Sequence, residues 1–164
     1  MITKNATALL MTAAAIFATT ASAAGIERKA APNAAIASSA AVPVGSKLFF
    51  ISGTTASPID PKDTDSPGAF GDTKAQTLSI LTKMKTQLAE LGLTMGDIVK
   101  LTVFMVGDPA TGGKMDREGM TASYKMFFGT PDQPNLPTRS TVQVAALGRP
   151  QTLIEIEAIA AKAP

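Results

Sequence analysis

The stretch from Thr73 to Leu91 restricts the fold more than any other part of the chain, because its apolar residues recur every three or four positions. This spacing is typical of an α-helix with one apolar face, and lysines occupy several of the remaining positions. The apolar positions are Leu78, Leu81, Met84, Leu88 and Leu91. Thr73 and Gln76 have the spacing of a capping box, and Gly92 suits a left-handed C-terminal stop. We therefore predict an amphipathic helix whose apolar face packs in the core.

Runs rich in β-branched and apolar residues lie on both sides of this helix and predict strands. The predicted strands are residues 40–44, 48–52, 98–106, 140–145 and 153–160. A tight turn between the first two runs indicates a hairpin, and the prolines of residues 53–71 indicate a long loop. A second helix is predicted from residue 115 or 116 to residue 128, where a glycine follows. The order strand, strand, helix, strand, helix, strand, strand indicates an α+β domain.

The N-terminus has the three parts of a secretory signal peptide. Lys4 supplies a positive charge, residues 8–18 are apolar, and Ala21-Ser22-Ala23 is a small-residue cleavage site. The apolar run is too short and too rich in alanine to span a bilayer, so no membrane attachment is expected after cleavage. We predict a signal peptide over residues 1–23, a loose arm over 24–39, one domain over 40–162, and a periplasmic or secreted location.

Histidine and cysteine are both absent from the sequence. Their absence excludes Ser-His-Asp triads, cysteine nucleophiles and the usual zinc sites, so no metal is expected. The formal net charge is only +2, and one tyrosine and no tryptophan are available for base stacking, so no nucleic-acid partner is expected. Any chemistry has to come from arginine, lysine, carboxylates, hydroxyls, the backbone and water.

Alternation along the last two predicted strands sorts their side chains by face. In the first strand one face carries two valines, and the other carries Arg139, Thr141 and Gln143. In the second strand one face carries isoleucine and alanine, and the other carries Glu155 and Glu157. If the apolar faces pack against the helices, these five polar side chains share the remaining face. Such a face either meets water or is covered by another subunit, and its flanking leucine and isoleucine favour a cover.

Two segments near the C-terminus resemble the RidA (YjgF) family, namely LPTRSTVQVA at residues 136–145 and IEIEAIA at residues 154–160. Three earlier segments agree with this resemblance and occur in the order expected of the family. They are ISG at residues 51–53, GDIVKLTVF at residues 96–104 and YKMFF at residues 124–128. The resemblance covers about residues 40–162, which is the whole predicted domain.

This resemblance implies a chorismate-mutase-like α+β fold, with a six-stranded mixed sheet and two helices packed on one face. It also implies a homotrimer whose active sites lie between subunits. Active members of the family hydrolyse 2-imino acids, which pyridoxal-phosphate enzymes release as enamines, to 2-keto acids and ammonia. No metal or cofactor is required, and the expected partner is a small imino or keto acid.

By the same resemblance, Arg139 and Glu155 are the expected catalytic residues. Arg139 would hold the substrate carboxylate through a bidentate pair, for which its planar guanidinium is better suited than a lysine. Glu155 would position or activate the attacking water. Ser52 and Thr121 would line the pocket, and the backbone carbonyl near Thr141 would hold the substrate nitrogen.

The chain departs from the family pattern at several pocket positions. Ser39 stands where a tyrosine is expected, Thr121 stands where an asparagine is expected, and Thr141 replaces a common cysteine. The turn between Leu147 and Gln151 is also one residue longer than the family pattern. These differences bear mainly on substrate specificity.

Two other functions remain open beside imine hydrolysis. The first is a trimeric binding protein in which Arg139 holds small carboxylates without turnover. The second is a ribonuclease, as some relatives have been described, although neither a histidine nor a marked basic face supports RNA cleavage. Only a rate that depends on Glu155 separates the enzyme from the binding protein.

Overall fold

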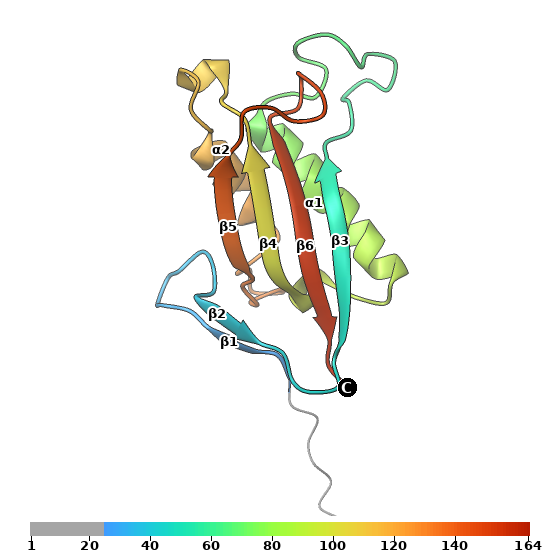
Figure 1. Ribbon diagram of the computed structural model, residues 1–164, viewed down its shortest axis with the longest axis vertical. Coiled ribbons are helices and arrows are strands. Elements are labelled where there is room, and N and C mark those ends of the chain that lie inside the picture. The colour runs from blue at the N-terminus through green and yellow to red at the C-terminus, as the bar shows by residue number, and fades with distance from the viewer. Residues whose placement is uncertain (1–24) are drawn as a thin grey trace, which may run out of the picture.

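The computed structural model describes residues 25–164 (Figure 1), which form a four-stranded sheet with helices on one face and a two-stranded hairpin near one end. The predicted signal peptide, residues 1–23, lies outside this described part. Within residues 25–164, no helix combines the length and the apolar character needed to cross a membrane.

The described strands and helices follow the predicted order, with one additional short strand at the start. The strands are β1 (Glu27–Lys29), β2 (Ser39–Ala41), β3 (Lys47–Thr55), β4 (Ile98–Met105), β5 (Thr138–Gln143) and β6 (Ile154–Lys162). The helices are α1 (Thr73–Glu90) and α2 (Arg117–Tyr124), with 3-10 turns at Met95–Asp97 and Pro109–Thr111. The predicted α+β class, with two helices on one face of a mixed sheet, is confirmed.

The main sheet has the strand order β3-β6-β4-β5. Strands β4 and β5 run parallel, whereas β6 is antiparallel to both β3 and β4. Six strands are present among the described residues, as expected, but only four of them share one sheet, because β1 and β2 pair with each other. The parallel pair requires a crossover, which the segment containing α2 supplies.

The predicted hairpin between residues 40–44 and 48–52 is wrong. Strand β2 pairs instead with β1, which lies inside the segment expected to be a loose arm. The short hairpin is tied to the domain by Arg28, whose Nη2 donates to the carbonyl of Gly96 at 2.7 Å, and by the Ala37 amide, which donates to the carbonyl of Pro137 at 3.0 Å. These partners are distant in sequence, so local turn residues did not reveal them.

The buried face of α1 differs slightly from the predicted one. Leu78 and Leu91 remain exposed, at 39% and 42%, whereas Ile80 takes the core position between them. The fully buried apolar side chains of this helix are Ile80, Leu81, Met84 and Leu88. Each such side chain contributes about 1.5–3 kcal/mol on burial, so this face fixes α1 on the sheet.

The N-terminus of α1 is also built differently from the prediction. Asp72 is the N-cap and accepts from the Ala75 amide at 2.7 Å. Gln76 is fully buried, and its side chain bonds to the backbone of Gly71, Gln151 and Leu153. Gln76 therefore ties the helix to the loop before β6 instead of closing a capping box. The predicted left-handed stop is confirmed, since Gly92 has a φ of 69°.

Candidate active site

Arg139 lies on the helix side of the sheet, which corrects the prediction that it shares a face with Glu155. Register pairs Arg139 with Leu101 and Thr141 with Val103, and both of these β4 partners are buried against the helices. Glu155 instead pairs with Phe104, whose side chain points to the open face. Alternation correctly groups the residues of β5, but it does not say which group meets the helices.

The guanidinium of Arg139 rests on α2. Its Cζ lies 4.4 Å from the centre of the Tyr124 ring, and its Nη1 makes a weak 3.7 Å contact with the Met120 Sδ. A cation above an aromatic face is attracted by the ring quadrupole, by about 0.5–2 kcal/mol. The ring therefore holds the guanidinium in place without neutralising it.

The charge of Arg139 is half-buried and has no carboxylate beside it. Burial lowers the pKa of Arg139, Tyr124 opposes this shift, and the positive charge of Arg117 adds to it. Burial likewise raises the pKa of Tyr124 to about 12, against the opposing effect of Arg139. Arginine stays protonated in proteins, so the site presents a partly desolvated cation ready to pair with an anion.

Two buried hydroxyl groups near Arg139 have no hydrogen-bond partner within the described part of the chain. They are the Tyr124 Oη and the Thr141 Oγ1. Thr141 follows Arg139 by two residues on β5 and so faces the same side of the sheet. A buried hydroxyl without a partner is destabilising by about 1–3 kcal/mol, which favours binding of a polar ligand that can pair with it.

Thr121 lies on the same helix as the residues under Arg139. It lines a hollow of about 390 Å³ together with Arg117, Glu118, Ala122 and Lys125. The sequence prediction that Thr121 belongs to the neighbourhood of Arg139 is therefore consistent with its position between Met120 and Tyr124.

Glu155 and Ser52 belong to the open face of the sheet. The Glu155 side chain lies directly across Gly53, where an added Cβ would overlap the Glu155 Oε1. The pairing of β3 with β6 shifts register between Ile51 and Thr54, so a bulge brackets this point. Glycine is required here because a side chain at residue 53 would displace the carboxylate.

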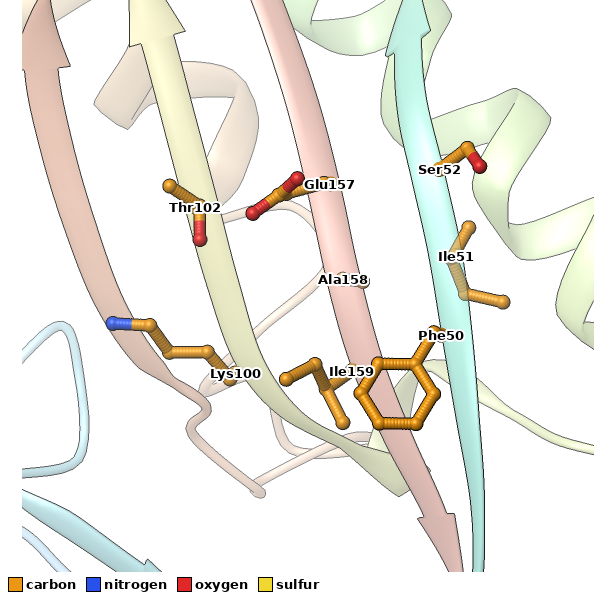
Figure 2. Close-up of a pocket in the computed structure, with 8 residues that line it drawn as sticks. All are labelled: Phe50, Ile51, Ser52, Lys100, Thr102, Glu157, Ala158 and Ile159. Atoms are coloured by element: carbon orange, nitrogen blue, oxygen red, sulfur yellow. The ribbon is translucent and has the colours of Figure 1, made fainter.

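Figure 2 shows the groove that Ser52 lines on the open face, with a volume of about 260 Å³. Polar side chains from β4 and β6 reach it, including Lys100, Thr102 and Glu157. The Lys100 Nζ donates to the Ser140 Oγ at 2.7 Å. Ser52 thus shares its groove with Glu157, which alternation had placed beside Glu155 but which was not predicted as a site residue.

The sequence profile described as Endoribonuclease L-PSP matches residues 28–162. The chain belongs to the RidA (YjgF) family. A 2-iminobutanoate/2-iminopropanoate deaminase of Salmonella typhimurium is 40% identical over 108 residues, covering 64% of this chain and 73% of the deaminase. TdcF of Escherichia coli is 36% identical over 139 residues, covering 84% of this chain and 95% of TdcF.

Solved structures of the RidA family share the fold. The structure of Escherichia coli TdcF with bound serine matches with a TM-score of 0.55 at 36% identity, over 74% of this chain and 84% of TdcF. A Rid protein from Yersinia pestis matches with a TM-score of 0.60 over 78% of this chain and 87% of its own, and at 23% identity it supports the fold alone. The predicted chorismate-mutase-like architecture is confirmed.

The side chains that could hold a ligand in this RidA-family chain are an arginine, carboxylates and hydroxyls. Among residues 25–164, no group of three or more acidic side chains is arranged to bind a metal ion. The two half-sites, one around Arg139 and one around Glu155, therefore define the chemistry that this chain can offer.

Proposed function

We propose that this chain hydrolyses 2-imino acids and their enamine tautomers to 2-keto acids and ammonia, in sites formed between the subunits of a homotrimer. The observation that carries the proposal is the half-buried guanidinium of Arg139, held over Tyr124 and free of any carboxylate that acts on it. Relatives that are 36–40% identical include proteins named as imine deaminases, which supports the same reaction class here.

Arg139 binds the substrate carboxylate and thereby fixes the position of the adjacent C=N carbon. The hydroxyls of Thr121 and Thr141, with the backbone near Thr141, lie on the same side of the sheet as partners for the substrate nitrogen. Glu155 takes a proton from water as the water oxygen bonds to the imine carbon. Proton transfer to nitrogen then lets the C–N bond break, releasing ammonia and leaving the 2-keto acid.

The assembly follows from the separation of the two half-sites. Arg139 and Glu155 lie on opposite sides of the sheet, so one chain cannot bring both to the same small substrate. The open face also exposes large apolar side chains, namely Phe50 at 75%, Leu48 at 47% and Val142 at 44%. A second copy that covers this face would bury the apolar side chains and bring its Arg139 to the Glu155 of the first.

Phe50→Asp is expected to dissociate the trimer into folded monomers. A charge at this position would be buried at the interface without a partner, whereas the isolated subunit already exposes the side chain. Light scattering measures the mass, and hydrolysis is expected to disappear with the trimer. Val44→Asp, at a fully exposed position, is the control and should remain trimeric. A monomeric wild-type protein at micromolar concentration would contradict the proposed assembly.

Gly53→Ala is expected to lower kcat about tenfold or more while changing the melting temperature little. The new Cβ displaces the end of a flexible Glu155 side chain, so the backbone is not strained, but the carboxylate leaves its position. Steady-state kinetics and thermal unfolding measure the two effects. Gly68→Ala, where an added Cβ meets nothing within 4 Å, is the matched control. Unchanged turnover in Gly53→Ala would argue against Glu155 as the group that acts on water.

The reaction itself is tested by adding the purified protein to 2-imino acids generated freshly from amino acids by an oxidase. Faster formation of 2-keto acid and ammonia than in the absence of protein is expected. If the protein binds 2-keto acids but accelerates hydrolysis of none of a varied set of imino acids, the chain is a binding protein for small carboxylates.

We also propose that the chain is exported, on the strength of the signal-peptide features of residues 1–23. N-terminal sequencing of protein from fractionated cells is expected to begin near Ala24 and to find the protein outside the cytoplasm. An intact Met1 on protein from the cytoplasmic fraction would contradict export.

A further inference from the structure

Arg117, the first residue of α2, is a second cation beside Arg139 that the proposed reaction does not use. Residues three, four and seven positions apart share one side of a helix, so Arg117 lies in line with Met120, Thr121 and Tyr124. Met120 and Tyr124 are the two α2 residues that contact the guanidinium of Arg139. Arg117 therefore stands one turn along α2 from the place where the first cation rests.

A hollow of about 390 Å³ lies against this side of α2. Of the charged residues that line it, Arg117 and Lys125 are cationic and Glu118 is anionic, and Thr121 lies between the two cations. The charge of Arg117 reaches Arg139, because it contributes to the lowered pKa of Arg139, and no carboxylate contributes in the opposite direction. The arrangement leaves two guanidinium groups repelling each other across a space with a hydroxyl donor.

Two like charges held close together raise the free energy of the folded chain unless an anion lies between or across them. A substrate with one carboxylate satisfies only Arg139. A substrate with two carboxylates, separated by one or two methylene groups, can pair with both arginines and relieve the repulsion. Thr121 can then donate a hydrogen bond to the second carboxylate.

We propose that the preferred substrates are dianionic 2-imino acids, whose 1-carboxylate binds Arg139 and whose side-chain carboxylate binds Arg117. The proposal rests on the imine hydrolysis proposed above and names the substrate class for that reaction. It also names the class of reaction that must supply the substrate, namely the oxidation of an acidic amino acid to its imine. Apolar imino acids remain substrates but leave Arg117 without a partner.

The proposal is tested by comparing two substrates that differ by one carboxylate. 2-Iminobutanedioate is generated from aspartate and 2-iminobutanoate from 2-aminobutanoate, each by an oxidase in the assay. The wild type is expected to show a kcat/KM about ten- to hundredfold higher for the dianion, which is the range of one charge-assisted hydrogen bond. Arg117→Gln is expected to lower the ratio of the two kcat/KM values at least tenfold, and Arg117→Lys to restore part of it.

Lys114→Gln is the matched control, because Lys114 is an exposed cation in the loop before α2 and is outside the hollow. This substitution removes the same net charge and should leave the ratio near that of the wild type. A loss of equal size in Lys114→Gln would mean that only general electrostatic attraction is at work, which would overturn the proposed contact.

Binding provides a readout that does not depend on turnover. Calorimetry with 2-oxobutanedioate and 2-oxobutanoate is expected to show tighter binding of the dianion by the wild type and loss of that preference in Arg117→Gln. Hydrolysis of 2-iminobutanoate without any preference for the dianion, in rate or binding, would overturn this inference and leave the proposed function standing. A dianion preference in binding without any hydrolysis would instead contradict the proposed function alone.

Discussion

Arg139→Lys is expected to lower kcat/KM for imine hydrolysis about ten- to hundredfold, and Arg139→Ala to lower it further. Lysine keeps the positive charge but cannot reproduce two parallel hydrogen bonds to a carboxylate. It also cannot stack a planar group on the Tyr124 ring, which lies 4.4 Å from the guanidinium. Because the ring positions the charge, the ammonium should bind the substrate both more weakly and less precisely oriented.

The effect of Arg139 on folding should be much smaller than its effect on catalysis. No carboxylate contributes to its pKa shift, so removing it leaves no buried anion unpaired. Thermal unfolding of both variants separates a misfolded protein from one that has lost its binding group. Arg149→Ala, at an exposed arginine in the loop before β6, is the control and should retain full activity. Hydrolysis at the wild-type rate by Arg139→Ala would reject the site.

Glu155→Gln is expected to reduce kcat by about a hundredfold or more, because general base catalysis contributes about 10²–10⁴ in rate. The amide keeps the size of the carboxylate and can still lie across Gly53, so the fold is expected to persist. Competitive inhibition by a 2-keto acid should remain close to that of the wild type, since the carboxylate of the inhibitor binds Arg139. The combination of lost turnover and retained binding distinguishes a proton acceptor from a binding group.

Glu157→Gln is the matched control for Glu155, because both glutamates lie on the open face of β6 two residues apart. Glu157 lines the groove that contains Ser52 and pairs in register with Thr102. A small effect is expected in Glu157→Gln. If this variant loses turnover and Glu155→Gln does not, the role of base belongs to Glu157.

The sequence predicted the succession of strands and helices well, since each element carries a strong local period. It predicted the hairpin partner of β2 incorrectly, because β1 is only three residues long and its Glu-Arg-Lys composition has no strand-like pattern. It also chose Leu78 over Ile80 for the buried face of α1, although both fit a helical period within a residue. Packing against the sheet decides between such positions, and packing is not visible in the period.

The candidate site shows the same limit. Alternation correctly separated Arg139 and Thr141 from Val142, but the assumption that valines face the helices placed Arg139 on the wrong side. Strand β5 is at the edge of the sheet, so its Val142 can be exposed at 44% while its polar side chains face α2. The signal for the correct side was the aromatic Tyr124 on α2, which offers a cation a surface to stack on.

The separation of Arg139 and Glu155 onto opposite sides of one subunit also has a genetic consequence. In a trimer that joins them across each interface, a chain defective in one residue and a chain defective in the other can complement each other. Mixing and reassembling two inactive proteins, Arg139→Ala and Glu155→Gln, would give about a quarter of the interfaces both intact residues. The same geometry means that one defective allele, expressed with a normal one, would impair sites to which the normal chain also contributes.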